Sequence, residues 1–188
     1  AAHVYPKHDY YSSVEGRVQE ATLDVLTGFN RLGSPDRIVA NSRYTAEYLS
    51  EVHGVRVRDI VYPGVSLDEF MYPFPEENMV LSVGQLWPHK RIDLVIEAMR
   101  HVEGMQLYVV GSGPQGPELK RMARAYGVTD RVFFLHDLTN HEVRTLYARS
   151  RAVVFTPVRE PFGIVALEAM AAGRPLIAVP EGGFTEVV

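Results

Sequence analysis

The chain has 188 residues, of which 46% are hydrophobic and 22% charged, and its formal net charge is −4. This is the composition of an ordinary globular domain, and it indicates neither a basic nucleic-acid-binding surface nor a segment that crosses a membrane. Cysteine is absent, which excludes disulfides and thiolate metal sites and agrees with the cytoplasmic location that we expect.

The first 36 residues differ from the rest of the chain. They are rich in tyrosine and polar residues and carry no strand signal. Ser12-Ser-Val-Glu15 matches a capping box, and an apolar stripe with helical spacing runs from Val14 to Phe29. We therefore predict that residues 1–36 form a helical N-terminal segment, the tail of a preceding region.

Residues 37–188 alternate regularly between short β-branched runs and amphipathic stretches. The runs predict strands at residues 38–40, 60–62, 79–83, 107–110, 132–135, 152–155 and 176–179. The stretches predict helices at residues 44–52, 92–99, 119–126, 142–149 and 163–172, with a last helix opening at 182–183. Because strands that are apolar throughout are buried on both faces, the alternation indicates βαβ units and an α/β fold with a doubly wound parallel sheet.

Two carboxylates, Glu160 and Glu168, lie eight positions apart around a Phe162-Gly163 turn that opens a predicted helix. A helix N-terminus offers unpaired N–H groups to a phosphate, and carboxylates accept hydrogen bonds from sugar hydroxyls. Alone, such a pair is more often two solvated helix-end residues. The motifs around it therefore decide its meaning.

Those motifs together resemble the nucleotide-sugar-binding half of a retaining glycosyltransferase of family 4, which has the GT-B fold. They occur in the family's order, each after a predicted strand, and cover about four fifths of the chain. The matching segments are Ile38-Val-Ala-Asn-Ser42, Tyr62-Pro-Gly-Val65, Val83-Gly-Gln-Leu86 with Lys90, Val110-Gly-Ser-Gly-Pro114, Glu160 through Glu168, and Gly182-Gly-Phe-Thr-Glu186.

The resemblance implies a role for each matching site residue. Lys90 would neutralise the leaving diphosphate, and Glu160 would contact the hydroxyls of the donor sugar, so these two are the catalytic candidates. Glu168 would bind the ribose, and His136 would border the nucleotide base. The remaining donor-binding candidates are Gly84, Gln85, Gly111, Gly113, Phe162, Gly163, Ile164 and Val165, the last four through backbone N–H groups. Gln85 departs from the family, since many relatives carry an arginine there, and Arg91 is the candidate to compensate.

The implied reaction transfers mannose or glucose from a UDP-sugar or GDP-mannose to an acceptor hydroxyl, with retention of configuration and without a metal or other cofactor. The acceptor, a glycan or glycolipid as in polysaccharide biosynthesis, would bind to an N-terminal domain that this chain lacks. We expect a donor-binding domain over residues 37–188, truncated at its C-terminal end and inactive alone. Peripheral membrane association of the complete enzyme is compatible with this interpretation.

Three alternatives stay open. Instead of a glycosyltransferase, the chain would be a nucleotide-binding module that acts with a partner, a GT-B nucleotide-sugar epimerase, or an NAD-dependent oxidoreductase. The last is suggested by Gly111-Ser-Gly-Pro-Gln-Gly116, which satisfies G-x-G-x-x-G, and by Asp137, about 20 residues further on. Against it, two βα units precede this loop, whereas the dinucleotide fingerprint lies on the first βα turn.

Overall fold

The computed structural model describes residues 37–54, 56–70 and 74–188. The helix expected within residues 1–36 lies outside the described residues. The chain divides into two compact units, residues 1–38 and 39–188, and the second of these contains every element described below.

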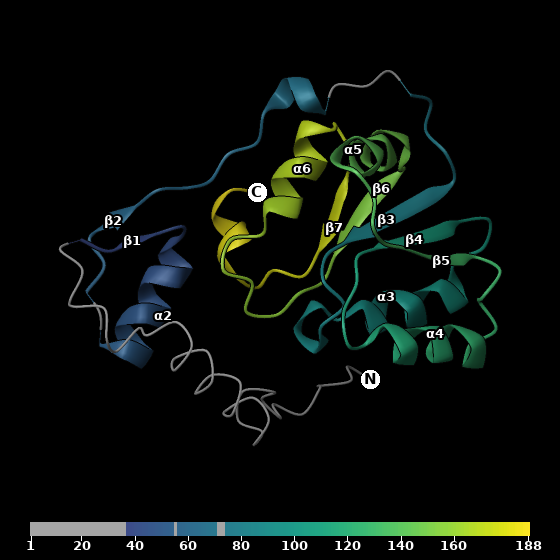
Figure 1. Cartoon of the computed structure of the whole chain (residues 1–188), viewed down its shortest axis with the longest axis horizontal. Coiled ribbons are helices and arrows are strands. Elements are labelled where there is room, and N and C mark those ends of the chain that lie inside the picture. The colour runs from purple at the N-terminus through teal and green to yellow at the C-terminus, as the bar shows by residue number, and fades with distance from the viewer. Residues whose placement is uncertain (1–36, 55, 71–73) are drawn as a thin grey trace. The chain divides into compact units, whose positions relative to one another are not determined.

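A parallel five-stranded sheet forms the centre of this unit (Figure 1). Its strands follow the order β5-β4-β3-β6-β7. From β3 the chain winds outward to β5, then returns to the other side of β3 and continues outward to β7. This reversal defines a doubly wound sheet, so the predicted fold class is confirmed. The strands are β3 (Met79–Val83), β4 (Gln106–Val110), β5 (Val132–Leu135), β6 (Ala152–Phe155) and β7 (Leu176–Ala178).

Two pairs of helices cover the two faces of the sheet (Figure 1). One face carries α3 (Ile92–Ala98) and α4 (Gly116–Ala125), and the other carries α5 (Asn140–Arg149) and α6 (Ile164–Ala171). Each helix lies within a few residues of its predicted position. Short 3-10 turns complete the set: η2 (Leu67–Glu69), η3 (Pro88–Lys90), η4 (Met99–His101) and η5 (Gly183–Glu186). The last helix predicted from residues 182–183 is therefore a single 3-10 turn.

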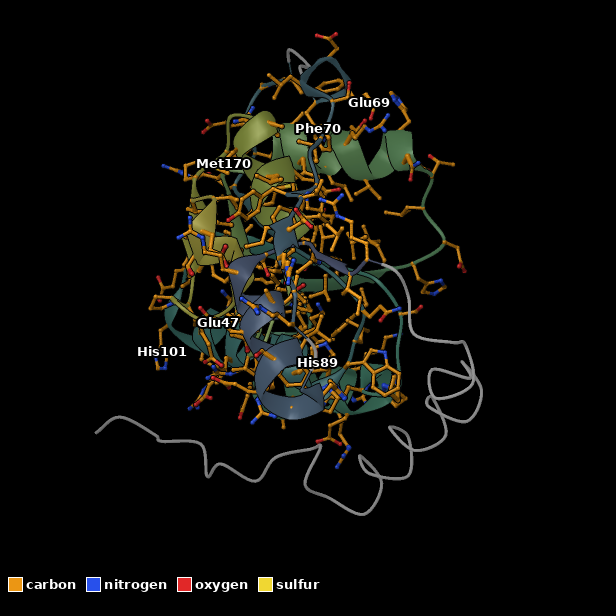
Figure 2. All side chains as sticks on the ribbon, turned by 90° about the vertical axis from the view of Figure 1, so that its left-hand side faces the viewer. Glu47, Glu69, Phe70, His89, His101 and Met170 are labelled. Atoms are coloured by element: carbon orange, nitrogen blue, oxygen red, sulfur yellow. The ribbon has the colours of Figure 1, made fainter. Side chains whose placement is uncertain are left out.

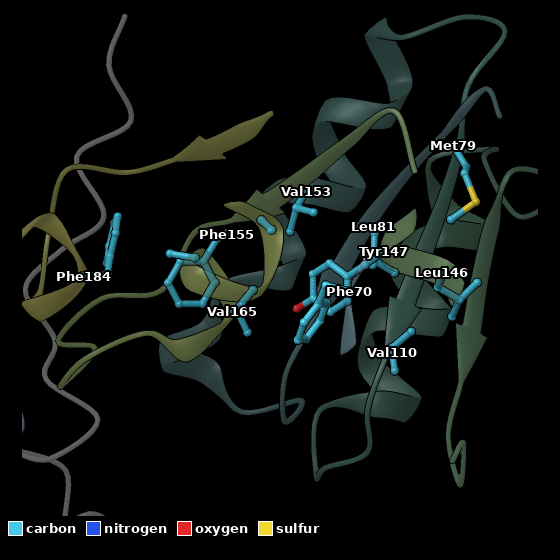
Figure 3. Packing of buried hydrophobic residues seen from close by; sticks show 12 residues of the cluster. Phe70, Met79, Leu81, Val110, Leu146, Tyr147, Val153, Phe155, Val165 and Phe184 are labelled. Carbon is cyan, nitrogen blue, oxygen red and sulfur yellow. The ribbon is translucent and has the colours of Figure 1, made fainter. Parts of the chain in front are cut away.

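The two faces of the sheet hold separate hydrophobic clusters. Leu107 and Val109 of β4 pack with α3 and α4, whereas the next residue, Val110, belongs to the cluster under α5 and α6. This alternation is what the period of two along a strand requires. Figure 3 shows Phe70 and Tyr147 beside Leu81 in the α5–α6 cluster. Because this cluster reaches α6, it also supports the helix that Glu168 comes from.

The first two predicted strands form a sheet of their own. β1 (Val39–Ala40) pairs in parallel with β2 (Asp59–Ile60), and α2 (Arg43–His53) connects them. Each strand has only two residues, and Val39 is 48% exposed, so neither is buried along its length as the central strands β3 and β6 largely are. The apolar runs thus predicted the strands but not the sheet to which they belong.

Candidate functional site

The predicted catalytic candidates meet at the carboxyl ends of two neighbouring strands. Lys90 follows β3 and Glu160 follows β6, and Lys90 Nζ donates to Glu160 Oε2 over 2.5 Å although the residues are 70 positions apart. Their side chains are 20% and 12% exposed. An ion pair shielded to this degree is screened less than a pair on the open surface. A cation is therefore fixed beside a carboxylate at the switch point of the sheet.

The backbone of the loop that carries Lys90 is hydrogen-bonded to the segment directly after β6. Val158 N donates to the carbonyl oxygen of His89 over 2.8 Å, and the Thr156 hydroxyl lies 3.3 Å from the carbonyl oxygen of Lys90. Burial lowers the pKa of His89, and the charge of Lys90 lowers it further. His89 is therefore held mainly in its neutral form, and the cation that pairs with Glu160 is Lys90.

Gly163 sets the start of the helix behind Glu160. Its φ of 78° is left-handed, and a Cβ there would lie 2.8 Å from Cβ of Phe184 and 2.9 Å from the ring of Phe155. Only glycine meets both conditions. α6 then begins at Ile164, and the N–H groups of its first turn have no acceptor within the helix. Of the four residues predicted to present N–H groups, Phe162, Gly163 and Val165 are buried and Ile164 is exposed.

Glu168 is held by a buried tyrosine. The Tyr147 hydroxyl donates to Glu168 Oε2 over 2.6 Å, and Tyr147 is fully buried on α5. Burial raises the pKa of Tyr147, and the charge of Glu168 raises it further, so the tyrosine stays a proton donor. Burial also raises the pKa of Glu168, while the Tyr147 hydrogen bond and the charge of Arg144 oppose that rise. The carboxylate is thus oriented by a tyrosine that was not among the predicted site residues.

Glu168 also lines a cavity of about 280 Å³ between α6, α5 and the segment before β3. Arg144 and Glu69 form an ion pair at this cavity, and Figure 2 shows Glu69 and Phe70 beside α5. The polar lining suits a ligand rich in hydroxyl groups. The lining residues are Gly64, Val65, Ser66, Glu69, Phe70, Asn140, Val143, Arg144, Ile164 and Glu168. Apart from Glu168 and Ile164, none was a predicted site residue, although Tyr62-Pro-Gly-Val65 was a matching motif and could have indicated this segment.

The glycine loops after β3 and β4 pack against each other. Leu86 N donates to Ser112 O over 2.9 Å. A Cβ on Gly111 would lie 2.0 Å from the carbonyl oxygen of Gly84, and one on Gly113 would lie 2.6 Å from that of Leu86. The close approach that excludes side chains at 111 and 113 is therefore made to a neighbouring loop. In a dinucleotide site the second glycine, here Gly113, is needed for close approach to the pyrophosphate, whereas here it is needed for contact with Leu86, so this geometry speaks against the oxidoreductase alternative.

The remaining predicted residues are spread over two places. Gly84 lies beside Lys90, since a Cβ on it would be 3.9 Å from Lys90 Cδ, and Gln85 in the same loop is exposed. His136 is exposed at the end of β5, and its Nδ1 lies 2.8 Å from Asp137 Oδ2. It does not line the cavity of Glu168. Its proposed role at the nucleotide base stays a prediction.

Within residues 37–54, 56–70 and 74–188, no three His, Asp or Glu side chains are arranged to hold a metal ion. No helix in the same residues is long and apolar enough to cross a membrane.

A doubly wound sheet with this site at its switch point is the architecture of GT-B glycosyltransferases, and solved structures bear out the likeness. Sucrose-phosphate synthase from Thermosynechococcus elongatus is 30% identical with a TM-score of 0.76, over 95% of this chain and 49% of that one. HepE from Anabaena, solved with UDP and glucose, has a TM-score of 0.73 over 90% of this chain and 50% of its own. Its 24% identity shows the fold alone.

The family follows from the sequence comparisons. Residues 68–188 match the family model "Glycosyl transferases group 1", and the chain belongs to this family. D-inositol 3-phosphate glycosyltransferase of Mycobacteroides abscessus is 32% identical over 173 residues, which are 81% of this chain and 39% of the relative. The chain thus spans about two fifths of the length of the curated relatives it matches.

Proposed function

We propose that this chain carries the donor-binding part of a retaining hexosyltransferase, which moves a sugar from a nucleoside diphosphate sugar to an acceptor hydroxyl. The observation that carries the proposal is the pairing of Lys90 with Glu160 next to the helix whose Glu168 lines the 280 Å³ cavity. In this proposal Glu160 comes first, Lys90 and the N-terminus of α6 come next, and Glu168 comes last. That order matches the parts of the proposed ligand, namely sugar, diphosphate and nucleoside.

Each group has a defined task in this proposal. As the bond between the anomeric carbon and the diphosphate oxygen breaks, negative charge develops on the leaving phosphate. Lys90 and the N–H groups at the start of α6 offset that charge in a partly shielded site. Glu160 accepts hydrogen bonds from the sugar hydroxyls, and Glu168 accepts them from the ribose. Since Lys90 and the N–H groups at the start of α6 supply the positive potential, we propose that no metal is required.

The donor and acceptor are proposed by class. The candidates are a UDP-sugar and GDP-mannose; HepE, which shares the fold, was solved with UDP and glucose. We propose that the acceptor, a glycan or glycolipid hydroxyl, binds to parts of the enzyme outside the residues described here, and that the reaction is cytoplasmic. The 188-residue chain alone should then bind a donor without transferring its sugar.

The test is a thermal-shift panel with UDP, GDP, ADP and NAD on the 188-residue chain and on Glu168→Gln. A ligand present at roughly 100 times its Kd stabilises the folded state by about 2.7 kcal/mol. We expect UDP or GDP to raise the Tm of the unsubstituted chain and to lose that effect in Glu168→Gln. Glu47→Gln, an exposed substitution with the same change of charge on α2 (Figure 2), is the matched control. A shift with NAD alone, or an undiminished shift in Glu168→Gln, would overturn the proposal.

A further inference from the structure

Glu186, in the last matching motif of the sequence, caps a helix that is far away along the chain. Its two carboxylate oxygens accept hydrogen bonds from the backbone N–H groups of Arg43 and Tyr44, each over 2.9 Å. The Tyr62 hydroxyl donates to the same carboxylate over 2.8 Å. These are first-turn N–H groups of α2, which have no acceptor within the helix. A negatively charged carboxylate at this end also interacts favourably with the positive end of the helix dipole.

The same end of α2 is bonded to the loop that carries Glu160. The hydroxyl of Ser42, the fully buried N-cap of α2, donates to the carbonyl oxygen of Pro161 over 2.6 Å. The Thr45 hydroxyl lies 3.2 Å from that oxygen. Pro161 is the residue directly after Glu160. The hydrogen bonds of α2 therefore reach the backbone next to a proposed sugar-binding carboxylate.

A third segment closes the junction from the side of η5. Gly183 N donates to the carbonyl oxygen of Glu160 over 2.8 Å. A Cβ on Gly183 would lie 2.0 Å from Pro161 O and 2.8 Å from Ser42 Oγ, so the three segments touch with no space for a side chain. The backbone of Glu160 is thus fixed from two directions, and its side chain remains the part that turns toward Lys90.

We infer that Glu186 and Ser42 are positioning residues, which lock α2 onto the Glu160 loop and so hold the Glu160 carboxylate where a donor sugar needs it. The inference rests on the proposed function for the role of Glu160, and on the hydrogen bonds alone for the lock. A simpler possibility is that Glu186 only caps α2. The two differ in one respect. If Glu186 locks α2 onto the loop, its loss destabilises the hydrogen bond made by the Gly183 amide, whereas the loss of a cap leaves that hydrogen bond unchanged.

Amide hydrogen exchange of the full 188-residue chain, read residue by residue by NMR, separates these possibilities. The variants are Glu186→Gln, which removes the charge and keeps the shape, and Ser42→Ala, which leaves the charge in place. Because loss of a helix cap costs an amount that corresponds to about tenfold in an opening equilibrium, Glu186→Gln should speed exchange at Tyr44 about tenfold. The lock requires a comparable increase at Gly183 in both variants.

Two internal references make the result interpretable. The amide of Leu107, which bonds to Arg131 O over 2.8 Å in the main sheet, should keep its rate, and this shows that the variant is folded. Glu47→Gln should change neither Tyr44 nor Gly183. Faster exchange at Tyr44 with an unchanged rate at Gly183 would reduce Glu186 to a cap and overturn the inference. Unchanged rates at both would also overturn it.

Titrations with UDP and UDP-glucose connect the lock to the ligand. Since Glu160 is proposed to contact the sugar, Glu186→Gln should weaken the binding of UDP-glucose by about tenfold, the value of a hydrogen bond to a charged group. The affinity for UDP should stay nearly unchanged. Equal weakening of both ligands would contradict a role in placing Glu160. If the unsubstituted chain binds neither UDP-glucose nor any nucleotide while exchange at Gly183 responds as expected, the lock stands and the proposed function fails.

Discussion

Replacing Tyr147 by phenylalanine removes one buried hydroxyl and nothing else of size. The ring can keep its edge-on contact with Phe70, whose centroid lies 5.8 Å away, so no large cavity forms. Glu168 loses the 2.6 Å hydrogen bond, and a bond to a charged group contributes about 1.5–3 kcal/mol. We expect Tyr147→Phe to lower the free energy of unfolding by about 2 kcal/mol at neutral pH.

The destabilisation caused by Tyr147→Phe should depend on pH, in a direction set by the pKa of Glu168. Burial raises the pKa of Glu168 and the Tyr147 hydrogen bond opposes that rise, so the substitution raises the pKa further. A carboxyl whose pKa is raised on folding stabilises the protein below its unfolded pKa, and this contribution is lost as the pH rises through its folded pKa. The groups around Glu168 are Tyr147 and Arg144 of α5, with Glu69 paired to Arg144. When Glu168 is protonated, the hydroxyl bonds a neutral group, and the loss falls to about 1 kcal/mol.

Urea unfolding at several pH values measures this difference. The expected result is a destabilisation that is larger at pH 7 than at a pH below the unfolded pKa of a glutamate, which is about 4.3. Tyr108→Phe is the control, because the Tyr108 hydroxyl has only a long contact, 3.4 Å, with Gln106. It should change stability by less than about 0.5 kcal/mol. A destabilisation by Tyr147→Phe that is the same at all pH values would refute the reasoning.

Two further substitutions test the helix start and the ion pair. Gly163→Ala should destabilise the chain by about 3 kcal/mol, from left-handed strain together with overlap with Cβ of Phe184 and the ring of Phe155. Gly127→Ala, with φ of 66° and nothing within 4 Å, should cost only about 1 kcal/mol. Equal losses of Tm would contradict the packing account. Lys90→Gln should weaken the binding of UDP at least about tenfold, as measured by calorimetry. Lys120→Gln on α4 should leave the Kd for UDP unchanged. An unchanged Kd in Lys90→Gln would show that Lys90 does not belong to the diphosphate site.

The parts of this protein that could be predicted from sequence are those that periodicity encodes. The apolar run at 79–83 and the helical stripe at 92–99 are β3 and α3 because burial on one face or on both leaves a regular trace in the sequence. Glu160 and Lys90 were identified through motifs that resemble a known family, each placed after such a strand. The same signal could not separate β1 and β2 from the main sheet, since a two-residue strand has no period that shows which sheet it joins.

Contacts between segments far apart in the sequence could not be predicted, for a different reason. Tyr147 has the pattern of a core residue in an amphipathic helix, and nothing near it marks the bond to Glu168. Gly111 and Gly113 satisfy a phosphate-binding pattern, yet their lack of side chains is required by the adjacent loop. Glu186 acts on a helix 142 positions away. In each case the partner is chosen by tertiary packing, and no local property of the sequence reports it.

Topology explains why the ion pair of Lys90 and Glu160 can exist. In the order β5-β4-β3-β6-β7, β3 and β6 are hydrogen-bonded neighbours although β4 and β5 lie between them in the chain. The loops after β3 and β6 therefore leave the sheet side by side, and a cation on one reaches a carboxylate on the other across 70 residues of sequence. A strand order without this reversal would separate the two loops. The fold thus brings the two charges together, and the motifs supply the residues that use the position.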